Sequence, residues 1–280
     1  MINYQREYNL KEISYAKNDA ICKFYIETTS IDLIKNIIKE GDYLFIGNTS
    51  KTLFCFKYKE IKIIKFISKE MKIYKNLIVV DSGMSLSKLG NICNNNGISG
   101  FEKLMTIPGL LGGSIFNNAS FLEQCISDNL LYLLIIDKQG NFRIIKKEEV
   151  ELNYRKINIK ILDEGYFIYK AIFKVKRKSF NELLKNKLLA INYRIKNQPQ
   201  IHSLGSTFKN LSNIKVYQLI DKYVNFTEYN GYSICQTHKN FIELRKDLDI
   251  LNLVKLIERI QEVLYNNIGL FIETEIKIIY

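Results

Sequence analysis

The chain has 280 residues, 47% of them hydrophobic, which is enough to bury a substantial core as one large domain or, as we expect, two of ordinary size. Its 41 basic and 29 acidic residues give a net charge of +12, but no block of five or six like charges occurs, which argues against a nucleic-acid partner. Its five cysteines include no Cys-x-x-Cys pair, so we expect neither a disulfide framework nor a metal site, and a reducing compartment fits.

The first elements in chain order predict a β-α-β unit. Residues 21–26 predict a strand, and Ser30 caps a helix whose apolar positions fall on one face before Gly41 ends it. Residues 43–46 predict the next strand. The loop after it, 47–51, stands where such units normally place ligand-binding backbone.

The middle of the chain predicts further strands, at 54–58, 61–67 and 77–80. A helix over 85–95 stops before Gly97, and 97–120 is expected to be loop apart from a short helix at 101–105. A hairpin follows, with strands at 130–136 and 142–145 joined through 137–140.

The last part of the chain begins with an aromatic and β-branched stretch, 166–176, that favours a strand. Composition shifts at 177–179, where a helix pattern starts, and we place the domain boundary there. Helices near 214–224 and 249–267 and a closing strand over 270–280 are expected after it.

No segment predicts a membrane span or a leader. The N-terminus lacks an apolar signal core, and the longest apolar run, 130–136, is far too short to cross a bilayer. We therefore expect a cytoplasmic protein without a membrane partner.

A glycine-rich stretch holds the first candidate site. It contains Pro108-Gly109, then Gly112-Gly113, then Asn117-Asn118-Ala119. Backbone N–H groups unobstructed by side chains, with two amides, suit a pyrophosphate or the polar edge of a flavin or nucleotide. A tight structural turn explains the same glycines equally well.

A second stretch, Gly205-Ser206-Thr207-Phe208-Lys209-Asn210, puts a hydroxyl, a cation and an amide into six residues. Taken alone, Ser206 reads as a turn or capping serine. No Gly-x-Ser-x-Gly elbow is present, and the sequence ties neither His202 nor His238 to Ser206 as an activating base.

Together these stretches resemble the UDP-N-acetylenolpyruvoylglucosamine reductase (MurB) family. Residues 97–119 match its flavin-binding signature in order and spacing. Further matches follow in the family's order, from about residue 43 to the end: Tyr154-Arg155, Gln198-Pro199, Gly205-Ser206, Phe208-Lys209-Asn210, His238, Asn240-Phe241 and Glu273-Thr274-Glu275-Ile276.

The resemblance implies an α+β fold. Residues 1–178 would form a two-part FAD-binding region of the PCMH/vanillyl-alcohol-oxidase type, with subdomains of about 1–60 and 61–178, and residues 179–280 an α+β substrate-binding domain. It also implies the compact family form and a monomer.

The implied activity is that of UDP-N-acetylmuramate dehydrogenase. Such an enzyme reduces UDP-N-acetylglucosamine enolpyruvate to UDP-N-acetylmuramate for peptidoglycan, with FAD as hydride carrier and NADPH as donor. By resemblance, Ser206 is the proton donor and Arg155 and Glu275 are its partners, all expected around one cavity. Without the resemblance, Arg155 and Glu275 would read as surface residues.

The resemblance also assigns binding residues. The cofactor set is Gly47, Asn48, Thr49, Ser50, Lys51, Pro108, Gly109, Gly112, Gly113, Asn118 and Ala119. The substrate set is Tyr154, Lys209, Asn210, His238 and Asn240, although His238 could equally be a satisfied core histidine.

The chain departs from the family at several of these positions. Residues 47–51 read Gly-Asn-Thr-Ser-Lys where the family usually has Gly-x-Gly-Ser-Asn, and Ser120 stands where glycine is usual. Side chains at Asn48 and Thr49 narrow the approach to a pyrophosphate, and a Lys51 contact with phosphate would offset the loss. The alternatives are a related flavin oxidoreductase with another substrate, or a flavin-deficient, non-enzymatic binding homologue.

Overall fold

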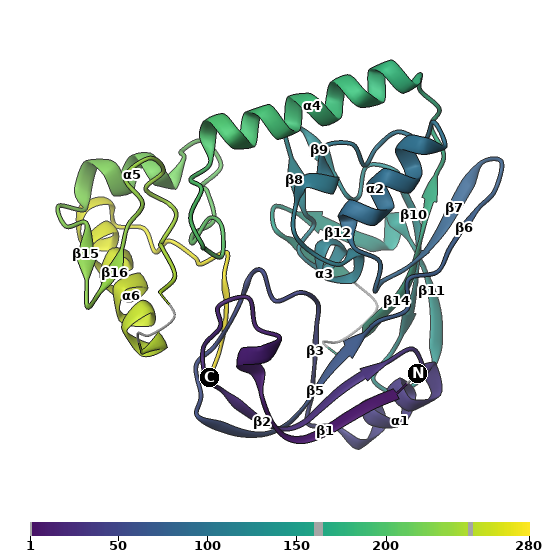
Figure 1. Cartoon of the computed structure of the whole chain (residues 1–280), viewed down its shortest axis with the longest axis horizontal. Coiled ribbons are helices and arrows are strands. Elements are labelled where there is room, and N and C mark those ends of the chain that lie inside the picture. The colour runs from purple at the N-terminus through teal and green to yellow at the C-terminus, as the bar shows by residue number, and fades with distance from the viewer. Residues whose placement is uncertain (1, 160–164, 246–248) are drawn as a thin grey trace. The chain divides into compact units, whose positions relative to one another are not determined.

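The computed structural model describes residues 2–159, 165–245 and 249–280, and they form two compact units (Figure 1). Unit 1 comprises Met1–Tyr8, Cys22–Asn48 and Glu60–Asn192. Unit 2 comprises Asn9–Ile21, Thr49–Lys59 and Tyr193–Tyr280, so two short N-terminal segments belong with the C-terminal part of the chain.

The first sheet carries the predicted β-α-β unit, which is confirmed. Its strand order is β1 (Ile2–Asn9), β2 (Ile21–Thr28), β5 (Tyr58–Phe66) and β3 (Tyr43–Ile46). Helix α1 (Ile31–Glu40) starts where the Ser30 hydroxyl accepts a hydrogen bond from the Leu33 N–H, and it ends at Gly41, whose φ is +81°. The apolar face of α1 is buried through Ile34, Ile37 and Ile38.

The second sheet of unit 1 has five antiparallel strands in the order β11 (Phe142–Lys146), β10 (Leu130–Ile136), β14 (Phe167–Lys174), β7 (Leu77–Asp81) and β6 (Met71–Ile73). The predicted β10–β11 hairpin is confirmed. Helices α2 (Leu86–Asn95) and α3 (Leu111–Phe116) pack on this sheet, and their side chains share one hydrophobic core with it (Figure 1).

Helix α3 corrects the prediction that 97–120 is loop apart from a helix at 101–105. The 101–105 region contains only a 3-10 turn, Leu104–Thr106. Two glycines weaken the local helix signal of α3, but Leu111 and Ile115 are buried in the core. Tertiary packing, which a local pattern does not record, therefore stabilises this short helix.

Small hairpins complete unit 1. Strands β12 (Val150–Asn153) and β13 (Lys156–Ile159) pair antiparallel and are joined by the turn Tyr154-Arg155. Strands β8 (Ser120–Phe121) and β9 (Gln124–Cys125) form the other. The sequence predicts neither hairpin, because such short strands carry little periodic signal.

Unit 2 is built around helix α6 (Ile250–Ile268), which Asp249 caps at one end and Gly269, at φ +69°, at the other. Its apolar face packs with helix α5 (Val216–Tyr223) and with strand β17 (Lys277–Ile279), which pairs in parallel with β4 (Thr52–Phe54). Unit 2 also contains the short strands β15 (Glu228–Tyr229) and β16 (Tyr232–Ser233). Helix α4 (Phe180–Asn197) begins in unit 1 and ends in unit 2.

The closing strand is shorter than predicted. Only 277–279 is regular strand, and Thr274 makes an isolated bridge with Phe208. Between α6 and that bridge, the Gln261 side-chain amide donates a hydrogen bond to the Ile272 carbonyl (2.7 Å). A side chain thus takes the place of a partner strand there.

No helix in the described ranges combines the length and apolar character needed to cross a membrane.

Gly90 tests how closely helix α2 approaches the segment 101–105. A Cβ at this position would lie 2.4 Å from the Met105 Cβ and 3.1 Å from the Phe101 carbonyl oxygen. We expect Gly90→Ala to lower the free energy of unfolding by about 1 to 3 kcal/mol, although alanine is the better helix former. Urea unfolding checks this against Ser87→Ala, an exposed change on the same helix; equal stabilities would contradict the close approach.

Candidate functional site

Ser206 and Glu275 lie on two segments of unit 2 that pair with each other. The Glu275 N–H donates to the Thr207 carbonyl (2.8 Å), and the Lys209 N–H donates to the Glu273 carbonyl (2.9 Å). Glu275 is therefore fixed beside the peptide that joins Ser206 to Thr207. The Glu275 side chain is only 7% exposed, whereas Ser206 is half-buried.

Lys51 joins these two segments. Its Nζ donates to the Ser206 carbonyl oxygen (2.7 Å) and forms an ion pair with Glu275 Oε1 (3.1 Å). The backbone places it there, because the Lys277 N–H donates to the Lys51 carbonyl (2.8 Å) where β4 and β17 pair. Nothing in the sequence signals this contact except the departure from the family's usual asparagine.

Gly205 leaves room for the Lys51 ammonium. Its φ is +71°, and a Cβ built on it would lie 3.1 Å from Lys51 Nζ. The backbone conformation favours glycine at this position, and a Cβ would crowd the ammonium.

Asn240 shapes the Ser206 segment from the other side. Its Oδ1 accepts a hydrogen bond from the Phe208 N–H, and its Nδ2 donates to the Phe208 carbonyl, both at 2.9 Å. Its backbone carbonyl accepts from the Thr207 N–H (2.8 Å), and the residue is 2% exposed. The side-chain amide is thus directed at backbone, which is a positioning contact.

The other sequence-predicted substrate residues of unit 2 have local partners. Lys209 Nζ forms an ion pair with Glu273 Oε2 (2.7 Å). Asn210 Oδ1 accepts from the Val216 N–H (3.0 Å) at the start of α5. The His238 ring lies against Tyr217 and Phe241, at centroid distances of 5.2 and 4.7 Å.

Arg155 belongs to unit 1, where it occupies the tight turn between β12 and β13 with φ +56°. Its guanidinium lies over the Tyr154 ring, 5.0 Å from the centroid, and Nη1 donates to the Ser120 hydroxyl (2.8 Å). A non-glycine residue in this conformation is strained, and such strain concentrates at functional sites. Ser120, noted in the sequence only as a lost glycine, is a partner of this arginine.

The end of the glycine-rich segment meets the same hairpin. Asn118 Nδ2 donates to the Asn153 carbonyl (3.0 Å), and Asn118 Oδ1 accepts from the Ser127 hydroxyl (2.8 Å). Ala119 is buried, and its N–H donates to the Ser114 carbonyl (2.8 Å). Unit 1 therefore brings the predicted flavin-loop residues next to the Tyr154-Arg155 turn.

The glycines of the segment differ in what requires them. The Gly112 N–H donates to the Ser82 carbonyl (2.8 Å), and a Cβ on Gly112 would lie 3.0 Å from the Ser82 Cβ. A Cβ on Gly109 would lie 3.3 Å from the Ser114 hydroxyl oxygen. Around Gly113, by contrast, a Cβ would meet none of the described atoms within 4 Å. The fold accounts for the first two glycines, whereas no neighbouring atom of the described residues requires glycine at position 113.

The predicted first loop contains Thr49 at φ +53°, which is strained for a β-branched residue. The Thr49 hydroxyl oxygen accepts a hydrogen bond from the Tyr15 N–H (2.8 Å), and the residue is 4% exposed. This hydrogen bond offsets part of the strain. Gly47 and Asn48 are counted with unit 1, and Thr49, Ser50 and Lys51 with unit 2.

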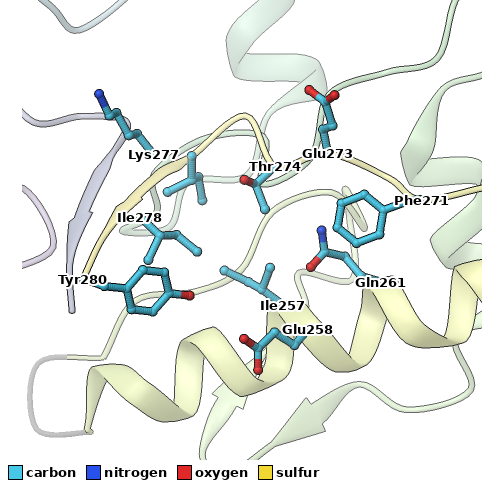
Figure 2. Close-up of a pocket in the computed structure, with 10 residues that line it drawn as sticks. Ile257, Glu258, Gln261, Phe271, Glu273, Thr274, Lys277, Ile278 and Tyr280 are labelled. Atoms are coloured by element: carbon cyan, nitrogen blue, oxygen red, sulfur yellow. The ribbon is translucent and has the colours of Figure 1, made fainter.

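A cavity of about 430 Å³ in unit 2 is lined in part by sequence neighbours of Glu275, but not by Glu275 itself (Figure 2). Its walls come from α6, through Ile257, Glu258 and Gln261, and from the C-terminal segment, through residues such as Thr274, Ile278 and Tyr280. Because Ser206, Glu275 and Lys51 are absent from its lining, we do not assign it to the candidate site.

Comparison with known proteins places the whole chain in one family. Residues 197–279 match the family model described as UDP-N-acetylenolpyruvoylglucosamine reductase, C-terminal domain. The reductase of that name from Rickettsia akari is 30% identical over 284 residues, spanning 99% of this chain and 95% of the relative. That from Prochlorococcus marinus is 27% identical, spanning 95% and 90%.

A solved structure has the same fold. The crystal structure of UDP-N-acetylenolpyruvylglucosamine reductase (MurB) from Thermus caldophilus superposes with a TM-score of 0.84 at 23% identity, covering 100% of this chain and 99% of that one. The α+β fold and the family resemblance expected from the sequence are confirmed.

His238 gives a pH-dependent prediction. Burial lowers the pKa of its imidazole below the ordinary value, and its Nδ1 has no hydrogen-bond partner among the described residues. Folding therefore disfavours the charged form, so the wild type should lose stability as the pH falls below the unfolded-state pKa of about 6.5. His238→Phe should remove that loss and change little at neutral pH.

Urea unfolding of both proteins at about pH 7.5 and about pH 5.5 measures the effect. The free energy of unfolding of His238→Phe, relative to that of the wild type, should be higher at the lower pH. An equal pH dependence of stability in the two proteins would contradict the idea that burial disfavours the charged form of His238.

Proposed function

This chain belongs to the UDP-N-acetylenolpyruvoylglucosamine reductase family, and we propose that it reduces UDP-N-acetylglucosamine enolpyruvate to UDP-N-acetylmuramate with NADPH and FAD, a step of peptidoglycan synthesis. The observation that carries the proposal is the convergence of Ser206, Glu275 and Lys51 in unit 2, inside the region matched by the family's C-terminal domain.

The residues present fit a bound flavin. Gly113 leaves open a surface that any larger side chain would fill, and the loops carrying Pro108-Gly109 and Asn118-Ala119 are fixed by the core beneath them. We assign FAD to these residues and to Gly47, Asn48, Thr49 and Ser50. When bound, FAD would carry the hydride from NADPH to the substrate.

The reaction requires a cation, a carboxyl group and a proton donor. Hydride addition to the enolpyruvyl methylene carbon moves an electron pair onto the neighbouring carbon and its carboxylate. Arg155, oriented by Ser120 and Tyr154, would stabilise that enolate charge. The Ser206 hydroxyl would then donate a proton to the carbon that bears the carboxylate, which completes the lactyl ether. Glu275 would orient the substrate carboxylate or its proton.

The UDP-sugar would be held by polar groups around this centre. Lys209 would supply a cation for the diphosphate, and Asn210 would supply an amide. Tyr154 and His238 would supply ring surfaces. Lys209 would have to exchange its Glu273 partner for phosphate; this ion pair is open to solvent, because the Glu273 side chain is 67% exposed. Asn240 acts here through the backbone of Phe208.

Ser206→Ala tests the assigned chemistry. The variant should be reduced by NADPH at close to the wild-type rate, because that step uses no substrate proton. Its reoxidation by UDP-N-acetylglucosamine enolpyruvate should slow by roughly 10²- to 10⁴-fold, the usual contribution of a general acid. Stopped-flow flavin absorbance separates the two steps.

Ser212→Ala, an exposed serine change in unit 2, is the matched control and should leave both steps unaltered. Reoxidation of Ser206→Ala at the wild-type rate would remove Ser206 from the mechanism. A wild-type protein that takes up no FAD would instead favour the flavin-deficient binding homologue.

Gly113→Ala tests the flavin assignment. In flavin-free protein the change should raise the free energy of unfolding by about 0.5 to 1 kcal/mol, because alanine is the better helix former and the space is open. FAD affinity, followed by flavin fluorescence, should fall roughly tenfold or more, equivalent to at least about 1.4 kcal/mol. Unchanged affinity would place the flavin elsewhere; Ser87→Ala is the control.

A further inference from the structure

We propose that Lys51 is a positioning residue for the proton-transfer step, holding the Ser206 backbone and the Glu275 carboxylate in one arrangement; this inference rests on the proposed function. It differs from a flavin-phosphate contact, the role that the position of Lys51 in the first loop suggests. The two roles lead to opposite measurements.

Direct contacts carry the inference. The Lys51 ammonium lies 2.7 Å from the carbonyl oxygen of Ser206 itself, so it fixes the residue whose hydroxyl would deliver the proton. Its second contact, 3.1 Å from Glu275 Oε1, fixes the rotamer of the carboxyl group. A proton donor must be held to within fractions of an ångström, and a displacement of about 1 Å can cost about 100-fold in rate.

The positive charge of Lys51 is a second argument for its role, because it balances the charge of Glu275. The proposed substrate brings a carboxylate and develops an enolate, and a nearby glutamate would add further negative charge. Glu275 is almost fully buried, so solvent screens its charge little. The ammonium at 3.1 Å balances that charge within unit 2.

The surroundings are built to keep Lys51 in place. Its backbone is fixed by the Lys277 N–H at the β4–β17 pairing, and Gly205 provides space for the ammonium. The asparagine usual in the family at this position has a short, neutral side chain that offers no charge to Glu275. The departure from the family motif therefore adds a cation to the proposed catalytic centre.

A set of Lys51 variants tests this in the purified holoenzyme. Lys51→Met keeps the aliphatic stem but removes the charge, Lys51→Arg keeps the charge, and Lys57→Met is a control at an exposed lysine of the same segment. Three quantities are measured for each: the FAD dissociation constant, the rate of reduction by NADPH, and the rate of reoxidation by UDP-N-acetylglucosamine enolpyruvate.

We expect Lys51→Met to slow reoxidation roughly tenfold to 100-fold, through kcat more than KM, while FAD affinity and NADPH reduction stay near wild type. Lys51→Arg should recover most of the rate. In a double-mutant cycle, Lys51→Met should add little to the effect of Glu275→Gln, because both remove the same ion pair.

Each other outcome overturns the inference in a distinguishable way. Wild-type reoxidation in Lys51→Met with weakened FAD binding would assign Lys51 to the flavin phosphate instead. Wild-type behaviour in every assay would leave it no role in this step. A wild-type enzyme that is reduced by NADPH but not reoxidised by the UDP-sugar would defeat the proposed function, and the role of Lys51 with it.

Discussion

Main-chain pairing among three distant segments of unit 2 is the constraint on which the proposed centre depends. Residues 207–209, next to Ser206, pair with 273–275, and β17 follows directly and pairs with β4. Because backbone groups make these hydrogen bonds, the pairing of the three segments does not depend on the side chain at position 51. A substitution at position 51 therefore leaves the segments paired and removes only the contacts by which Lys51 holds the Ser206 carbonyl and the Glu275 carboxylate.

Local signals were sufficient for much of the fold. Ser30 and Gly41 set the ends of α1, and the β10–β11 hairpin follows from its apolar strands and turn residues, because each depends on neighbours in sequence. Helix α3 was missed for the opposite reason: its stability comes from the core beneath Leu111 and Ile115. The family was recognisable because its motif spacing survives at about 30% identity.

The sequence predicts the candidate site as a set of positions, and it gives no information on the contacts that those residues make. Lys51 and Ser120 stood out in the sequence only as departures from the family pattern, with the loss of a glycine or an amide as their evident effect. In the structure, Lys51 contacts Ser206 and Glu275, and Ser120 accepts a hydrogen bond from Arg155. Both contacts join residues far apart in the chain, which no local pattern encodes.

Conformational cost bears on the location of the site only together with the sequence motifs. Thr49 and Arg155 adopt positive φ, and α3 contains Gly113 at an open position where alanine would suit the helix better by about 1 kcal/mol. Positive φ also occurs elsewhere, at Asn230, whose type tolerates it, and at Lys17, whose type does not, so backbone conformation alone does not mark a site. What distinguishes Thr49, Arg155 and Gly113 is that they lie in the segments that carry the family motifs, where selection for a ligand and a reaction can outweigh selection for stability.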